Sequence, residues 1–208
     1  MRMPHRLLLP AAAAVLLTAA CASTNGASAN GSAAGSAASD SSVPVSGAAQ
    51  ASDYQPLAIG NRWTYRGTMG GQTVEKSITT LGIDQGFFVD DAGGRMKIDR
   101  DGLRDDKRYL LKNPIARGSN WMAVVSPSST ERYEITGTDV TVETPAGKFE
   151  HCVVVHASNR IDSTKQLENE WTYAPGVGIV KIETKLRDGS QLIPQALVEL
   201  VSHRLEAR

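Results

Sequence analysis

One cysteine in the second half of the chain has histidines nearby that could form a nucleophilic site with it. His151 directly precedes Cys152, and His156 follows four positions later. A thiol nucleophile needs a base within hydrogen-bonding distance. The apolar run around Cys152 predicts a strand, on which His151 points to the opposite face and His156 lies about 13 Å along the same face. The spacing therefore favours a buried thiol over a Cys–His pair.

Acidic residues gather around two expected turns and could suggest a cation site. They are Asp90, Asp91, Asp99, Asp101, Asp105 and Asp106. A calcium loop needs oxygen ligands at closer, regular spacing, and this segment lacks the third acidic position of the EF-hand pattern. Interleaved lysines and arginines also neutralise the aspartates. We expect solvated turns and no metal site.

No other segment has the residue pattern of a catalytic site. The serines between Ser126 and Ser129 lack the glycines of a nucleophile elbow, and Gly176-Val177-Gly178 lacks the longer pattern of a phosphate loop. The 22 basic residues equal the 22 acidic ones, which argues against a nucleic-acid partner because phosphate binding needs a basic surplus. We expect a protein that is not an enzyme and has no cofactor.

The N-terminal residues form an export signal. Arg2 and Arg6 precede an uncharged apolar stretch from Leu7 to Ala20. A membrane-spanning helix needs about 20 apolar residues, so this stretch is too short to be a permanent anchor. A basic start, a short apolar run and small residues at its end predict a secretory signal peptide over residues 1–20.

The end of this signal, Thr18-Ala19-Ala20-Cys21, resembles the lipobox of bacterial lipoproteins. The resemblance implies cleavage before Cys21, a diacylglyceryl group on its thiol and fatty acylation, such as palmitate, at the new N-terminus. Because Ala22 rather than an aspartate follows, it also implies sorting to the outer membrane, facing the periplasm. Ordinary signal cleavage, with Cys21 incidental, stays open as the alternative.

The next segment is a tether. Ala, Ser and Gly fill 23 of the 31 positions from 22 to 52, and none is aromatic. Such a chain cannot bury enough apolar surface to offset the entropy of ordering. We expect residues 21–52 to be a lipidated cysteine followed by a disordered linker, with a mean span of about 30 Å. The folded domain is expected over residues 53–208.

This domain is predicted to be all-β. Apolar and polar residues alternate over 140–144 and 181–186, and turn pairs such as Asp188-Gly189 separate such segments. About ten or eleven strands fit the chain. Turns at this density favour an antiparallel meander that forms a half-barrel, a barrel or a sandwich.

A short frame of proline, aliphatic residue, alanine, glycine and tryptophan occurs twice, over 56–63 and 114–121. Its glycine supplies an unusual backbone angle, and its tryptophan is the first large residue of the next strand. The three tryptophans are expected to fill the core near strand starts. Five aromatic residues are candidates either for the core or for an aromatic-lined pocket: Trp63, Tyr65, Trp121, Trp171 and Tyr173.

Three motifs carry a family resemblance, namely those over 56–65, 144–152 and 173–181. In order and type they resemble the TapB-like family of exported, β-rich bacterial proteins. The resemblance implies a β fold and a location in the cell envelope. It supplies no catalytic residues.

These observations favour a non-catalytic lipoprotein, anchored to the outer membrane through Cys21, whose β domain binds a partner protein or another envelope component. Two alternatives stay open. One is a carrier for a lipid or other apolar ligand, with tryptophans lining an open cavity. The other is an immunity or inhibitor lipoprotein that acts against a periplasmic toxin or hydrolase.

Overall fold

Twelve strands and one helical turn make up the part of the chain that this computed structural model describes, residues 48–69 and 71–206. The elements are α1 (Ala51–Tyr54), β1 (Arg62–Met69), β2 (Gln72–Asp84), β3 (Phe87–Asp90), β4 (Arg95–Asp99), β5 (Gly102–Arg104), β6 (Tyr109–Lys112), β7 (Asn120–Ser126), β8 (Ser129–Thr144), β9 (Gly147–Arg160), β10 (Lys165–Ala174), β11 (Gly178–Asp188) and β12 (Gln191–Arg204). The all-β prediction is confirmed, with twelve strands rather than ten or eleven. Within the described residues, no helix has the length and apolar character needed to span a bilayer.

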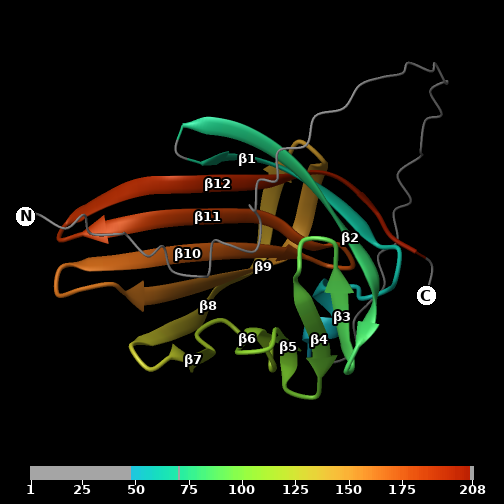
Figure 1. Cartoon of the computed structure of the whole chain (residues 1–208), viewed down its shortest axis with the longest axis horizontal. Helices are drawn as coiled ribbons and strands as arrows, with labels where there is room; N and C mark the ends of the chain where they lie inside the picture. The colour runs from blue at the N-terminus through green and yellow to red at the C-terminus, as the bar shows by residue number, and fades with distance from the viewer. Residues whose placement is uncertain (1–47, 70, 207–208) are drawn as a thin grey trace, which may run out of the picture. The chain divides into compact units, whose positions relative to one another are not determined.

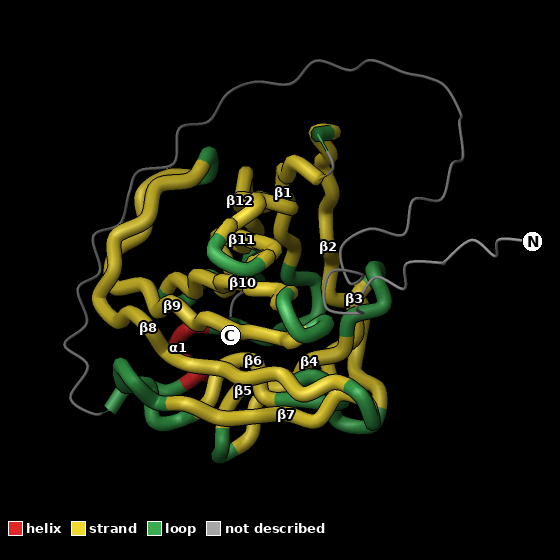
Figure 2. The backbone as a smooth tube through the Cα atoms, turned by 90° about the vertical axis from the view of Figure 1, so that its left-hand side faces the viewer, coloured by secondary structure: helices red, strands yellow, loops and turns green. Residues whose placement is uncertain are grey.

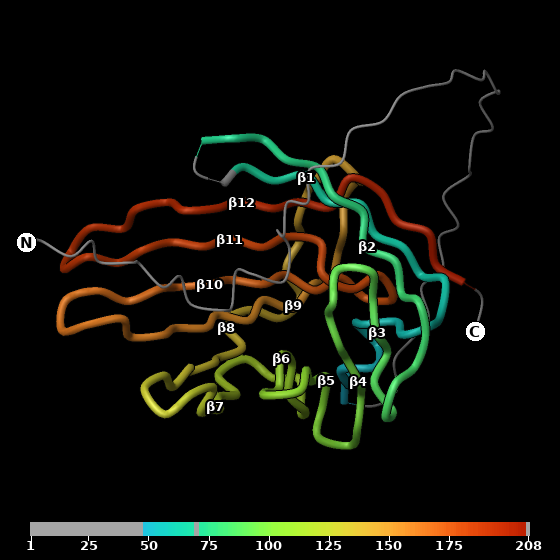
Figure 3. Tube along the Cα trace, viewed as in Figure 1, coloured from blue at the N-terminus to red at the C-terminus, as the bar shows by residue number. Residues whose placement is uncertain are grey.

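All twelve strands belong to one antiparallel sheet, which follows chain order except at one place (Figures 1 and 3). The first strand, β1, pairs with the last, β12, while β6 and β7 form the two edges of the sheet. The sheet curls until these edges approach each other (Figure 2). The indole N–H of Trp121 on β7 donates to the carbonyl of Tyr109 on β6 at 2.9 Å. The meander is therefore a nearly closed barrel rather than a sandwich.

Irregular pairing bends the longest hairpin, β8–β9. The register between these strands shifts three times from Ile135 to Val142, and Asp139 and His151 have φ angles of 63° and 57°. Bulges of this kind increase twist and bend a strand. The distal half of the hairpin therefore leaves the barrel wall (Figure 2), and its turn reaches β12.

Side-chain alternation places one face of the sheet in the barrel interior. Across β7, β8 and β9, the paired residues Trp121, Tyr133 and Ala157 lie in one row, and all three are buried. Leu103 and Leu111 pair across β5 and β6 and are fully buried in the same core. We call the line along which the edge strands β6 and β7 approach each other the β6–β7 seam. The strands on both sides of this seam thus contribute to a single apolar interior, and the burial of its side chains stabilises the curled sheet.

The described chain begins with a short segment that packs against the core. The compact unit is Ala48–Arg208, and Ala51 is fully buried. The carbonyl of Asp53 accepts a hydrogen bond from the Gly176 N–H at 2.7 Å, in the turn between β10 and β11. The predicted signal peptide, Cys21 and most of the predicted linker lie outside the described residues.

The repeated sequence pattern over 56–63 and 114–121 forms a similar turn into a strand at both places. Gly60 and Gly118 have φ angles of 92° and 85°, a region that favours glycine. Trp63 and Trp121 are each the second residue of the strand that follows. Trp171 differs, because it lies near the end of β10 rather than at a strand start. The expectation that all three tryptophans mark strand starts is wrong for this one, since its motif shares the tryptophan without the preceding proline and glycine.

Candidate functional site: a buried charged cluster beside an aromatic stack

All five candidate aromatic residues are buried. Their exposed fractions are 4% for Trp63, 8% for Tyr65, 8% for Trp121, 9% for Trp171 and 1% for Tyr173. The Trp121 and Tyr133 rings stack with centroids 5.2 Å apart, and Tyr133 and Trp171 follow at 6.1 Å. A ring that lined an open cavity would expose one face to solvent. The three stacked rings, covered by each other and by the core, instead form part of the packed interior.

Polar atoms of the buried aromatic residues find partners in the backbone. The Trp63 indole N–H donates to the Val177 carbonyl at 2.7 Å, and the Tyr65 hydroxyl donates to the Ile179 carbonyl at 2.9 Å. Both bonds join β1 to the segment that begins β11. Burial strongly raises the pKa of the Tyr65 hydroxyl, so this group stays neutral. The side chains of Trp63 and Tyr65 thus stabilise the contact between β1 and the start of β11, and their polar atoms are occupied by these bonds.

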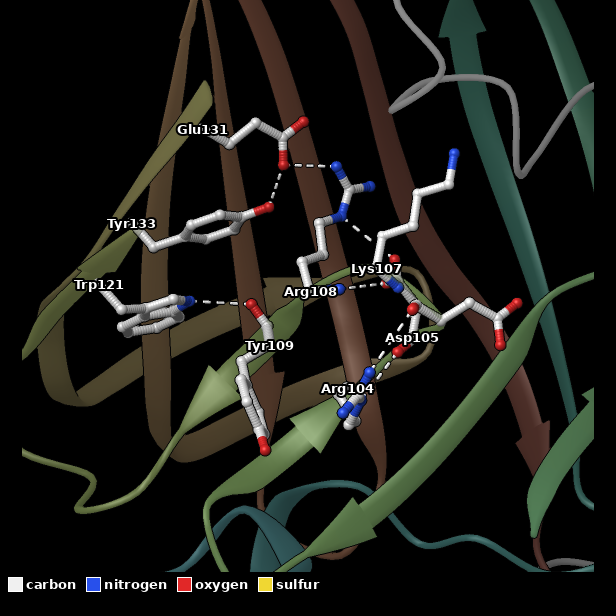
Figure 4. Close-up of polar contacts among 9 residues, drawn as sticks. Arg104, Asp105, Lys107, Arg108, Tyr109, Trp121, Glu131 and Tyr133 are labelled. Atoms are coloured by element: carbon white, nitrogen blue, oxygen red, sulfur yellow. Dashed lines mark hydrogen bonds and ion pairs between the residues drawn. The ribbon is translucent and has the colours of Figure 1, made fainter. Parts of the chain in front are cut away.

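A charged cluster lies against this stack (Figure 4). Glu131 of β8 accepts hydrogen bonds from the Tyr133 hydroxyl and from the Arg108 guanidinium. The Nε of Arg108 also donates to the Asp105 carboxylate at 3.1 Å. The Arg108 and Glu131 side chains are only 11% and 6% exposed. This is an ion pair removed from most of the solvent, with the tyrosine hydroxyl as an additional donor.

Two elements from opposite sides of the seam bring these residues together. Strand alternation points Glu131, Tyr133 and Ile135 of β8 into the interior, and all three are buried. Asp105 shapes the β5–β6 connection, because its carboxylate accepts backbone N–H groups from Lys107 and Arg108. That turn directs Arg108 across the seam towards β8. The ion pair therefore helps to hold the two edges of the sheet together.

The surroundings of Arg108 and Tyr133 raise the pKa of both side chains. Burial by itself would lower the pKa of Arg108, but the neighbouring Tyr133, Glu131 and Asp105 outweigh it and leave the pKa above its ordinary value. Burial raises the pKa of Tyr133 far above its ordinary range. At neutral pH the arginine is charged and the tyrosine is neutral. Neither group can act as an acid or base near pH 7, so the arrangement fits positioning rather than proton transfer.

The cysteine lies in the interior. Cys152 is fully buried and has no disulfide partner among the described residues, and burial raises the pKa of its thiol to about 11. The nearby histidines contact carboxylates. The Nδ1 of His151 lies 2.5 Å from Asp139, and the Nε2 of His156 lies 3.9 Å from Glu168. The buried thiol expected from the sequence is observed, and neither histidine serves it as a base.

Several of the clustered aspartates stabilise turns. The Asp90 carboxylate accepts the N–H groups of Ala92 and Gly94, and that of Asp99 accepts the N–H of Asp101. Among the residues that the structure describes, no three His, Cys, Asp or Glu side chains are grouped so that they could hold a metal ion.

Sequence reasoning missed the two central members of the charged cluster. Glu131 carries a signal, because it alternates with Tyr133 and Ile135 on a strand and so occupies an inward position. An acidic residue in such a position needs a buried partner. Arg108 carries no comparable signal, since it lies in a charged run that also fits a solvated turn.

Comparison with known proteins gives distant likenesses. No family model and no curated protein sequence matches the chain. A protein from Bacteroides fragilis, provisionally described as exported and as having a YmcC-like fold, is 16% identical with a TM-score of 0.41, over 73% of this chain and 99% of its own. A protein from Parabacteroides distasonis, provisionally described as a lipoprotein, is 14% identical with a TM-score of 0.39, over 72% and 97%. Both are too distant to assign a fold or a function, and the resemblances to the lipobox and the TapB-like family stay predictions.

Proposed function

We propose that this protein is a lipoprotein anchored at Cys21 in the outer membrane and facing the periplasm. Its β domain binds a partner protein or another envelope component through its outer surface and catalyses no reaction. The observation that carries the proposal is the burial of the candidate pocket residues. The stacked rings of Trp121, Tyr133 and Trp171 are buried against one another with the Arg108–Glu131 pair beside them, whereas a carrier would need such rings to line an open cavity.

The outer surface offers apolar contacts that the interior does not use. Met122 and Val124 on the edge strand β7 are 67% and 73% exposed, and Leu81 on β2 is 61% exposed. Exposed aliphatic side chains of this kind are suited to a protein contact. Cys152, the residue closest to a nucleophile in type, is buried with a raised pKa, which supports a binding role over an enzymatic one.

Affinity capture tests this proposal. The compact unit, residues 48–208, is the bait in a detergent extract of bacterial envelopes, and both bound proteins and bound lipids are identified. We expect one protein or envelope polymer to be retained reproducibly and to be displaced by excess free domain. A matched bait with Met122→Ser and Val124→Ser should retain less of it. A reproducible lipid with no other component would contradict the proposal and favour the carrier.

A further inference from the structure

Cations and aromatic rings cluster on the outward side of four short strands, next to the charged cluster described above. Ile98 of β4 and Leu103 of β5 pair across the sheet and point to the core. Their neighbours Lys97 and Arg104 also pair, so these two side chains point outwards by alternation. We call the set the cation–aromatic face, which comprises Phe87, Arg95, Lys97, Arg104, Tyr109 and Lys112.

The rings hold the cations in place. The Nζ of Lys97 lies 4.9 Å from the centre of the Phe87 ring, and Cζ of Arg104 lies 5.5 Å from that of Tyr109. The Nζ of Lys112 lies 5.7 Å from the Tyr109 ring. Every cation–π contact found among the described residues belongs to this face. Figure 4 shows Arg104 and Tyr109 next to the charged cluster.

Positive charge on this face is only partly compensated within the domain. The Asp99 carboxylate accepts a hydrogen bond from the Tyr109 hydroxyl at 3.2 Å. Asp84 and Asp106 pair with Arg95 at 2.5 and 3.2 Å. No carboxylate of the described chain forms an ion pair with the remaining three cations, Lys97, Arg104 and Lys112. Like charges directly opposite each other on neighbouring strands, as in the Lys97–Arg104 pair, destabilise a sheet. An anionic partner would remove this cost.

The start of the described chain lies beside this face. The Ala51 N–H donates to the side chain of Asn113 at 2.9 Å, and Asn113 directly follows Lys112 at the end of β6. The Ile115 N–H donates to the Ala49 carbonyl at 3.4 Å. The described chain therefore begins next to the cations.

We propose that the cation–aromatic face docks on anionic phospholipid headgroups of the membrane that holds the anchor. This inference rests on the lipid anchor of the proposed function. Lysine and arginine near a bilayer surface are attracted to anionic lipids, and aromatic rings favour the same interface. For the 26 residues between Cys21 and Ala48, the sequence predicts a linker with a mean span of about 30 Å, which would keep the face within reach of the bilayer. Docking would set which side of the domain is presented to a partner.

Vesicle binding tests the inference without any acyl chain. The chain used is residues 21–208 with Cys21→Ser, and the probes are vesicles of phosphatidylglycerol with phosphatidylcholine and vesicles of phosphatidylcholine alone. The test variant combines Lys97→Gln, Arg104→Gln and Lys112→Gln. The control combines Arg62→Gln, Arg132→Gln and Arg160→Gln, which removes the same charge from exposed positions elsewhere on the barrel.

We expect the parent and the control to bind the anionic vesicles, with binding that weakens as salt rises. The test variant should partition about a hundredfold less. Should it fail to fold, Lys97→Gln and Lys112→Gln alone should each lower partitioning about fivefold. Equal binding by test variant and control would overturn the inference. So would an absence of binding by the parent, or binding to soluble polyglutamate in place of vesicles. None of these results depends on acylation of Cys21, which fatty-acid labelling tests separately.

Discussion

At the residue scale, the ion pair between Arg108 and Glu131 is the feature with the clearest energetic consequence. Replacing Arg108 with alanine leaves the Glu131 carboxylate buried without its cation. Breaking a buried pair in this way costs about 3–5 kcal/mol of the free energy of unfolding. The matched control is Arg66→Ala, whose partner Glu75 is exposed and whose loss should cost about 1 kcal/mol or less.

Urea unfolding of both variants measures this difference. Arg108→Ala should have the lower midpoint by a wide margin, with an unchanged slope. Equal losses would mean that solvent reaches the Arg108–Glu131 pair, contrary to its burial.

The thiol of Cys152 gives a second prediction at this scale. With its pKa raised to about 11 by burial, about one thiol in a thousand is ionised at about pH 8, against about a quarter for a free cysteine. In a Cys21→Ser chain, a thiol-specific reagent should therefore label the native protein slowly and the urea-unfolded protein quickly. Labelling of the native protein at the rate of an exposed thiol would contradict the burial of Cys152.

The sequence indicates some residues of the interior and misses others for a physical reason. The aromatic residues and the central cysteine stand out because their types favour burial wherever a strand carries them. The Arg108–Glu131 pair joins positions 23 apart in the chain, from two sides of the seam. Only the curl of the sheet brings them together, and no local pattern records that curl.

At the element scale, β5 and β6 pack so closely that one glycine is required. Gly102 has a φ of 141°, and a Cβ atom there would overlap the Leu111 carbonyl oxygen. Gly118 also has a positive φ, of 85°, but a Cβ atom would meet open space. Gly118→Ala should cost about 1–2 kcal/mol for its backbone angle alone, and Gly102→Ala should cost about 1–3 kcal/mol more through overpacking.

The comparison of these two alanine variants by urea unfolding tests the packing of β5 against β6. Gly102→Ala is expected to be clearly the less stable. The packing would be in doubt if the two variants unfolded at the same urea concentration.

Hairpins are the elements that the sequence indicates best. The Asp188-Gly189 pair predicts a turn, and the turn lies one residue further on, at Gly189-Ser190, between the end of β11 at Asp188 and the start of β12 at Gln191. The turn between β8 and β9 also lies within the segment expected, after Thr144. The bend in the β8–β9 hairpin was not predicted, because Asp139 and His151 reach positive φ angles without a glycine to indicate them. The helical turn α1 was not predicted, since four residues are too few to show a helical repeat, and it spans the expected boundary between linker and domain at Asp53.

At the scale of the whole molecule, the barrel has a buried aromatic and aliphatic core, and its outer surface differs from one side to another. One part of the exterior is apolar, at the exposed β7 side chains Met122 and Val124. Another, over β3–β6, carries cations held by rings. The described chain begins beside the second of these surfaces. We infer that the two surfaces have different partners: the cationic side faces the membrane, and another side binds the partner.

The alternation of apolar and polar residues and the turn-forming residues indicate an all-β fold, but they do not show that the sheet closes into a barrel. Closure depends on β1 meeting β12 and on the contacts across the β6–β7 seam. The first joins strands from opposite ends of the domain. The second joins consecutive strands through side chains, without the backbone pairing that alternation and turn signals indicate. The sequence could therefore predict an antiparallel meander and leave barrel and sandwich as alternatives.

The central claim is that an acylated Cys21 holds this β domain at the outer membrane. Fatty-acid labelling and fractionation of cells that produce the full chain, with and without Cys21→Ser, test it most directly. The parent should incorporate label and sediment with the outer membrane, and the variant should be unlabelled and soluble in the periplasm. A parent chain found in the cytosol with residues 1–20 still attached, or a variant that still carries label, would contradict the account.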